Sequence, residues 1–287
     1  MRIITCVLIL LSAFGAAGGN AAVDTLRSKL HAARTLPSDL EVSGDLAGVP
    51  RGETRYVRQE DLLAASHPMT ISPDDGNFKD TTKVRAIFLE DLARELGIPS
   101  TDMLIADCKD KYQAHYTRQY VAQYHPALIT ELNGAPLRAS QDDDYGPYMI
   151  AHVNFKMAAE SRALDEEPQI PWGVVRLQFR DEDATLSSIK PRIANLDKAV
   201  GYEVAEENCL RCHNAGDVGG LKSGVNWTVL GALAANSPDF FATYVRDPKS
   251  KNRNTRMAAS PEYDDPTMAA LIAYFRTFAP QTQGGSH

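Results

Sequence analysis

Cysteine, histidine and tryptophan are scarce in this 287-residue chain, which has 4 Cys, 7 His and 2 Trp. So few cysteines exclude a disulfide-rich scaffold. Long apolar runs are also missing: the one notable run, Ile3–Leu11, is shorter than the roughly 20 residues that a membrane-spanning helix needs. Acidic residues outnumber basic ones, and the formal net charge of -7 disfavours nucleic acid as a partner.

The N-terminal sequence MRIITCVLILLSAFGAAGGNAA is typical of an export signal, because Arg2 precedes the apolar run and small residues follow it. We expect residues 1–22 to be removed, which predicts a periplasmic or secreted protein whose mature chain has no membrane span. Cys6 is lost with the signal. The cysteines that remain are Cys108, Cys209 and Cys212, and their odd number argues against a fully paired disulfide framework.

The hydrophobic pattern changes near residues 187–197, which predicts a domain boundary there. Upstream, the alternation predicts strands at 39–46, 103–108 and 172–180 and helices at 58–65 and 88–96. Asn133-Gly134 between two apolar stretches predicts a hairpin. Downstream, helices are expected at 197–213 and at 264–278, the second with Asp265 as its N-cap and Pro266 in its first turn. The fold class is therefore a mixed α/β domain, 38–190, followed by an all-α domain, 197–280.

The segment EENCLRCHN, residues 206–214, carries the strongest motif in the chain. Residues three and four apart lie on one face of a helix, so the side chains of Cys209, Cys212 and His213 can all contact one planar group that lies against that face. Cys-x-x-Cys-His is the attachment signature of c-type haem, with two thioether bonds and a histidine on the iron. A redox-active cysteine pair and a zinc site are the alternatives. A redox-active cysteine pair prefers a thioredoxin-like βαβ frame. A zinc site needs two further ligands, but His287 is the only histidine after His213 and no cysteine follows it.

With this motif, the downstream region resembles a class I cytochrome c. Gly201 lies eight residues before Cys209, and Leu271, Tyr274 and Phe275 hold the packing positions of a C-terminal helix. The resemblance implies that the iron takes His213 on one side and Met257, from the loop before that helix, on the other. Met268 is the competing methionine, but it belongs to the apolar stripe of the helix, which favours core packing.

The loop around Met257 is basic. Arg246, Lys249, Lys251, Arg253 and Arg256 stand against a single carboxylate, Asp247. A basic rim beside a haem edge would steer acidic redox partner proteins, so we expect the segment Arg246–Arg256 to be their docking region. A solvated loop without a docking role is the alternative.

Residues 38–190 resemble the sulfite-oxidase-type molybdopterin-binding fold. The resemblance rests on DLEVSGDLAG, LEDLARELG, ADCKDKYQAHY and ALITELNGAPL followed by YGPYMI. The family's cofactor motifs are missing, because Cys108 is followed by Lys109-Asp110-Lys111 where members carry Gly-Asn. We expect Cys108 to be a buried thiol, and its polar neighbours to have structural roles: Asp107, Asp110, Tyr112 and His115.

Together these features favour a periplasmic mono-haem c-type cytochrome that carries single electrons without catalysis, with an N-terminal domain that recognises a partner or ligand. The first alternative is an oxidoreductase subunit whose N-terminal domain oxidises a small substrate at a molybdopterin site and passes the electrons to the haem. The second is a haem sensor in which a gas displaces Met257.

Overall fold

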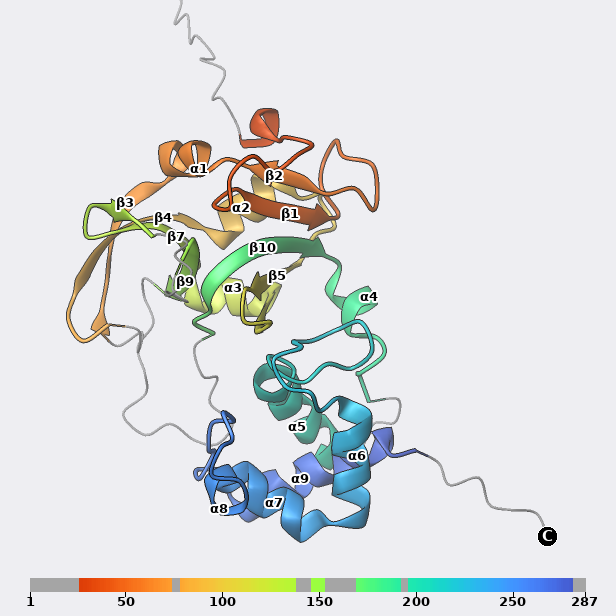
Figure 1. Ribbon diagram of the computed structural model, residues 1–287. Coiled ribbons are helices and arrows are strands. Elements are labelled where there is room, and N and C mark those ends of the chain that lie inside the picture. The colour runs from red at the N-terminus through yellow and green to blue at the C-terminus, as the bar shows by residue number, and fades with distance from the viewer. Residues whose placement is uncertain (1–25, 74–77, 138–145, 153–168, 192–195, 281–287) are drawn as a thin grey trace, which may run out of the picture.

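The computed structural model describes residues 26–73, 78–137, 146–152, 169–191 and 196–280. The predicted export signal, residues 1–22, lies outside them. We call the described residues 26–191 the sheet lobe and 196–280 the helical lobe; Figure 1 shows the sheet lobe above the helical lobe. Within the described parts of the chain, every helix is too short or too polar to cross a bilayer.

The sheet lobe is built on one 10-stranded mixed sheet in the order β2-β1-β10-β9-β7-β4-β3, with β5 and β6 attached at β10 and β8 at β7. The strands are β1 (Leu40–Gly44), β2 (Arg55–Val57), β3 (His67–Ile71), β4 (Thr82–Phe88), β5 (Met103–Cys108), β6 (Gln113–Thr117), β7 (Pro126–Leu132), β8 (Ala135–Pro136), β9 (Tyr148–His152) and β10 (Trp172–Arg180). β1 runs parallel to β10, whereas β10 pairs antiparallel with β5 and β9. The predicted mixed α/β class of this part of the chain is therefore confirmed.

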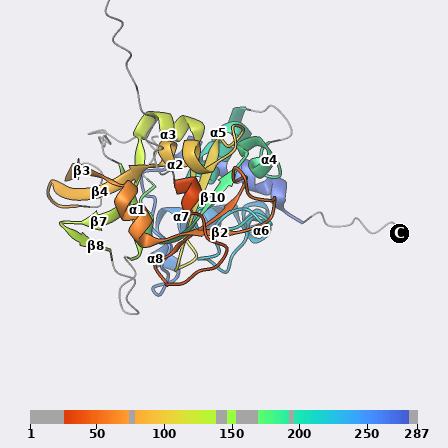
Figure 2. The same cartoon turned by 90° about the horizontal axis from the view of Figure 1, so that it is seen from above.

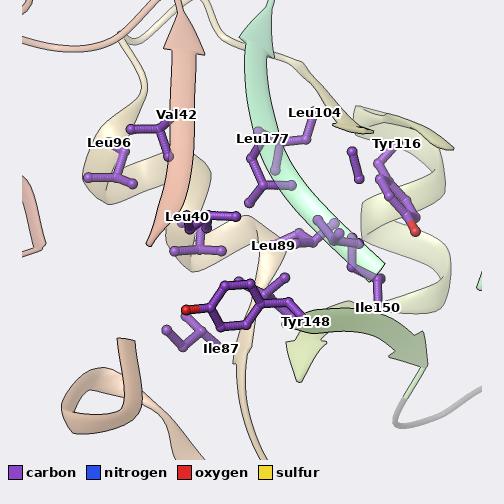
Figure 3. Close-up of a cluster of buried hydrophobic side chains, with 14 of the residues drawn as sticks. Leu40, Val42, Ile87, Leu89, Leu96, Leu104, Tyr116, Tyr148, Ile150 and Leu177 are labelled. Atoms are coloured by element: carbon purple, nitrogen blue, oxygen red, sulfur yellow. The ribbon is translucent and has the colours of Figure 1, made fainter. Parts of the chain in front are cut away.

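Short helices cover the sheet: η1 (Leu26–Lys29), α1 (Gln59–Ala65), α2 (Leu89–Leu96), α3 (Arg118–Tyr124) and α4 (Glu182–Leu186). Helix α2 buries its apolar face, Leu89, Leu92 and Leu96, against the sheet. These leucines join Leu40 and Leu177 from the strands in the main core, shown in Figure 3. Seen from above, α2 and α3 lie side by side over the sheet (Figure 2).

The strands predicted at 39–46, 103–108 and 172–180 are confirmed as β1, β5 and β10, and the helices predicted at 58–65 and 88–96 as α1 and α2. The Asn-Gly hairpin joins β7 to β8. Asn133 and Gly134 have φ angles of 50° and 83°, which are the left-handed values that a two-residue type I′ turn requires.

The described residues of the helical lobe form helices and turns: α5 (Leu196–Val204), a π-helical turn η3 (Ala205–Cys209), α6 (Trp227–Asn236), α7 (Pro238–Arg246), α8 (Pro248–Lys251), α9 (Asp265–Phe275) and η4 (Arg276–Phe278). Two details of the prediction are wrong. The helix expected to run through His213 changes to the π-helical turn after Val204. The N-cap of α9 is Asp264 and not Asp265, because the Asp264 carboxylate accepts the Thr267 amide at 2.8 Å.

Helices α5 and α9 cross in very close contact at Gly201. A Cβ placed on Gly201 would lie 2.2 Å from the carbonyl oxygen of Ala270 and 2.7 Å from the Cβ of Tyr274. Only glycine lets two backbones approach so closely. The expected packing of Gly201 against the C-terminal helix is therefore confirmed, and Leu271 and Phe275 are fully buried in the same core.

Strand β5 takes part in the cores of both lobes. Leu104 and Ala106 point into the main core of the sheet, whereas Met103 and Ile105 belong to the core of the helical lobe. Side chains alternate between the two faces of a strand, so one strand serves two cores. Strand β5 is thus held by the two separate apolar cores, one on each of its faces.

Candidate functional site

The Cys-x-x-Cys-His segment forms a tight turn at the end of the π-helical turn η3. Leu210 N–H donates to Ala205 C=O at 2.9 Å, the wide i to i+5 bond of a π-helix, which recurs at functional sites. After it, the Cys212 and His213 amides both donate to Cys209 C=O, at 3.1 and 2.9 Å. This single helical turn keeps Cys209 and His213 four residues apart on one side.

Both cysteines of the turn are free thiols and half-buried. Burial raises the pKa of Cys209 to about 12, and burial also raises the pKa of Cys212 against the opposing effect of Lys222 and Arg211. A redox-active cysteine pair needs the reverse, a lowered thiol pKa that supplies a thiolate. Among the described residues, no three His, Cys, Asp or Glu side chains form a group able to hold a metal ion.

The imidazole of His213 is oriented by one hydrogen bond. Its Nδ1 lies 2.7 Å from the carbonyl oxygen of Val225. A carbonyl only accepts, so Nδ1 carries the proton and donates, and Nε2 keeps its lone pair. Burial lowers the pKa of His213, which keeps the ring neutral at pH 7. A neutral imidazole whose second nitrogen is fixed by a backbone carbonyl is the arrangement of a metal-ligating histidine.

A glycine-rich loop folds back over the turn and satisfies its carbonyl groups. Gly220 N–H donates to Leu210 C=O at 2.8 Å, and Ser223 N–H donates to Cys212 C=O at 2.9 Å. Gly219 has a φ of +96°, and a Cβ on Gly220 would lie 2.0 Å from the Arg211 carbonyl oxygen. Glycine is therefore required at both positions for the loop to lie this close to the cysteine turn.

Met257 lies in the loop between α8 and α9, half-buried against the core of the helical lobe. The loop is anchored where it passes the methionine. Tyr244 Oη donates to Thr255 Oγ1 at 3.1 Å, and Thr255 Oγ1 accepts the Met257 amide at 3.2 Å. Met268 is 3% exposed inside the core on α9, in agreement with the packing role expected for it.

The basic segment Arg246–Arg256 spans α8 and the start of this loop. Arg246 is bonded at the N-terminal end of α9, because its guanidinium donates to the Tyr263 carbonyl at 2.8 Å and to the Asp265 carboxylate at 2.7 Å. The other four cations are exposed, and no carboxylate of the described residues forms an ion pair with them: Lys249, Lys251, Arg253 and Arg256. The free positive charge therefore lies immediately before Met257.

The polar residues around Cys108 have structural roles, as expected. Asp107 accepts from Gln113 Nε2, Arg176 Nε and Gln178 Nε2 at 2.6 to 2.7 Å. Cys108 is 6% exposed, and burial, with the nearby Asp110 and Asp107, raises the pKa of its thiol far above the usual range. A metal would have to displace the proton of this buried thiol in order to bind it.

A cleft of about 600 Å³ lies between the two lobes. Its walls combine Gln178 and Arg180 of β10 with Gln113 of β6 and with Asp217 and Val218 of the loop after the cysteine turn. No pattern in the sequence predicts this cleft, the bond from Gln113 N–H to Arg211 C=O or the bond from the His213 ring to Val225. These residues are brought there by contacts between distant segments.

No family model matches the chain. Cytochrome c oxidase subunit 2 of Alkalihalophilus pseudofirmus is 33% identical over 84 residues, which are 27% of this chain and 24% of the relative. The chain therefore spans about a quarter of that relative's length. Among solved structures, the sulfane dehydrogenase SoxCD of Paracoccus pantotrophus overlaps 53% of this chain and 40% of its own, with 15% identity and a TM-score of 0.34. The likeness is a loose link to cytochrome-related proteins and assigns no activity.

Proposed function

We propose that this chain is a periplasmic c-type cytochrome that carries single electrons on one covalently attached haem, with the sheet lobe as a module that recognises a partner or ligand. The observation that carries the proposal is the fixed His213 ring. Its Nδ1 is held by the Val225 carbonyl, and its Nε2 is left for a metal, in the same turn as two free thiols.

The donor groups of the turn fit haem c. Cys209 and Cys212 are neutral, half-buried thiols that can form the two thioether bonds, and His213 Nε2 is the proximal ligand. Met257 is assigned as the sixth ligand. When bound, the haem supplies a reversible one-electron iron couple. A haem held by His213 and Met257 would have no open coordination position on its iron, which suits electron transfer and would leave no site for oxygen.

A buried donor without a partner supports the same fit. Trp227 is 1% exposed, and its indole Nε1 has no hydrogen-bond acceptor among the described residues. Its backbone amide donates to the carbonyl of Asn214, directly after His213, and its indole packs against Tyr274, Phe275 and Phe278. An unpaired buried N–H is costly, and a haem propionate would satisfy it.

Covalent attachment is tested by exporting the protein in a host that matures c-type cytochromes. The wild type should be red, with haem that stays on the chain after denaturation. Cys209→Ala with Cys212→Ala should abolish attachment, whereas Cys108→Ala, the matched control, should leave it unchanged. A colourless wild-type protein would refute the proposal.

The sixth ligand is tested in the same preparation. Met257→Ala should remove the long-wavelength absorption band of methionine-ligated ferric haem and open the iron to carbon monoxide. Met268→Leu, a volume-conserving change in the core, should keep the band. Loss of the band only in the Met268 variant would reverse the assignment. Rapid carbon monoxide binding by the wild type would favour the sensor alternative.

The docking role of the basic segment rests on its unpaired exposed cations. Lys251→Glu with Arg253→Glu should slow electron exchange with acidic partner proteins at low salt, and the difference should shrink as salt screens it. Lys79→Glu with Lys83→Glu makes the same charge change at exposed positions of the sheet lobe and serves as the control. Equal rates for both double variants would leave the segment as a solvated loop.

The oxidoreductase alternative requires a molybdopterin in the sheet lobe. Cys108 is 6% exposed, and the residues that follow it lack the family's Gly-Asn, so the residues present do not fit that cofactor. Metal analysis separates the two functions, because stoichiometric molybdenum with iron would support the enzyme, and iron without molybdenum supports the electron carrier.

A further inference from the structure

The sheet lobe contacts the cysteine turn directly through the connection between β5 and β6, residues 108–113, which we call the clamp hairpin. Gln113 N–H donates to Arg211 C=O at 3.0 Å, between the two cysteines of the motif. Gln113 Oε1 accepts the Gly219 amide at 3.0 Å. The clamp hairpin therefore bonds to the backbone on both sides of His213.

The same hairpin makes a second pair of contacts at the far end of the glycine-rich loop. Leu221 N–H donates to Lys111 C=O at 2.9 Å, and Lys222 forms an ion pair with Asp110. Both charged side chains are about 40% exposed, so this ion pair contributes little energy by itself. The buried bonds of Gln113 are the stronger part of the clamp.

The carbonyl groups of the turn show why the hairpin matters. Cys209 C=O is satisfied within the turn, and Leu210 and Cys212 C=O accept from the glycine-rich loop. Arg211 C=O accepts from Gln113 of the sheet lobe. Of these four carbonyl groups, that of Arg211 is the one whose hydrogen-bond donor comes from the sheet lobe.

The side chain of Gln113 is itself held rigidly. It is 8% exposed, its Nε2 donates to Asp107 at 2.7 Å, and its Oε1 also accepts from His115 Nε2 at 2.8 Å. Asp107 is fixed in turn by Arg176 and Gln178 of β10. Each polar atom of the Gln113 amide therefore has a partner, and the chain of bonds extends into the sheet.

We propose that Gln113 is a positioning residue for the iron site, through which the sheet lobe fixes the Cys209–His213 turn and so sets the reduction potential. The proposal rests on the function proposed above. The potential of a haem depends on how its ligands and surrounding hydrogen bonds are held. Losing the Gln113 side chain would release the Gly219 amide and loosen the loop over the turn, which changes the geometry of the neighbouring His213, whereas the backbone bond from Gln113 to Arg211 C=O remains.

The chain offers a matched pair for the test. Gln113 and Gln178 are both glutamines, both are 8% exposed, and both donate Nε2 to Asp107 at 2.7 Å. Only Gln113 touches the cysteine turn. Gln113→Met and Gln178→Met remove the amide with little change of volume, and Gln113→Asn is a milder variant that keeps an amide but shortens its reach.

In red, folded protein, Gln113→Met should change the equilibrium constant for reduction at least threefold, which is about 28 mV at 59 mV per tenfold for one electron. Gln178→Met should leave it within experimental error, and Gln113→Asn should fall between. Amide hydrogen exchange gives a second readout that needs no haem. Gly219 should lose protection in Gln113→Met and keep it in Gln178→Met.

The outcomes separate this inference from the proposed function. Equal potentials and equal Gly219 protection in the two methionine variants, in protein that carries haem, would overturn the positioning role alone. Equal shifts in both variants would also overturn it, because the effect would then belong to Asp107 and the sheet. A colourless wild-type protein would overturn both proposals.

Discussion

Substituting Gly201 by alanine sets two opposing effects against each other, and the structure decides which is larger. Alanine in a helix interior is favoured over glycine by about 0.5–1 kcal/mol. Against this, the new methyl group would lie 2.2 Å from the Ala270 carbonyl oxygen, about 1 Å inside the closest ordinary carbon–oxygen contact. Overpacking of this kind costs about 1–3 kcal/mol, because α5 and α9 must separate. Because the 2.2 Å overlap is with backbone, the cost falls in the upper part of that range, and we expect Gly201→Ala to destabilise the protein by about 1–2 kcal/mol net.

For a cooperative unit of this size, that loss lowers the melting temperature by about 2–8 °C. Thermal unfolding followed by circular dichroism measures it. Gly224→Ala is the control, because a Cβ there meets nothing within 4 Å and the backbone needs no left-handed φ. The control should be neutral or slightly stabilising. A Gly201→Ala protein that melts at or above the wild type would refute the close crossing of α5 and α9.

Two further predictions concern acid stability. Burial opposes ionisation of Asp39, but hydrogen bonds from Leu36 and Thr35 outweigh it and hold its pKa below the usual value. The stability that this carboxylate provides is therefore present above its unfolded pKa and is lost as the pH falls through the lower, folded pKa. Asp39→Asn should remove that part of the pH dependence of the free energy of unfolding, measured in urea. Burial lowers the pKa of His115 from 6.5 to about 3, so between these pH values the unfolded chain binds a proton that the folded chain does not, and the protein becomes less stable as the pH is lowered. His115→Phe should flatten that slope, and an unchanged slope would show that another group is responsible.

Local patterns in the sequence were sufficient for many individual elements. Apolar spacing places α2 and β10, and the Asn133-Gly134 pair determines its turn by backbone conformation alone. The boundary of α9 was missed by one residue because Asp264 and Asp265 are equally good caps in sequence, and only the fold shows which carboxylate reaches Thr267. The π-helical turn before Cys209 has no sequence signal of comparable strength.

The candidate site also combines residues that the sequence predicts with residues that only the fold identifies. Cys209, Cys212 and His213 are recognisable because their spacing is local. The acceptor for the His213 ring, Val225, and the clamp residue Gln113 depend on folding over longer distances, and one of them lies in the other lobe. Neither residue type suggests its role. A backbone carbonyl is present at every position, and a glutamine in a strand is ordinary, so only the three-dimensional contacts identify them.

The expected boundary near residues 187–197 raises the question of whether the lobes unfold separately, and β5 gives a physical answer. Ile105 is 4% exposed in the core of the helical lobe, while its neighbours Leu104 and Ala106 belong to the core of the sheet lobe. Ile105→Ala removes three carbons from a buried site and should cost about 2–4 kcal/mol. Because the strand is shared, we expect one cooperative transition, with the haem absorbance and the far-ultraviolet signal falling together and at the same lower temperature in the variant. A variant in which only the haem signal moves, with the sheet melting as in the wild type, would show that β5 does not couple the lobes.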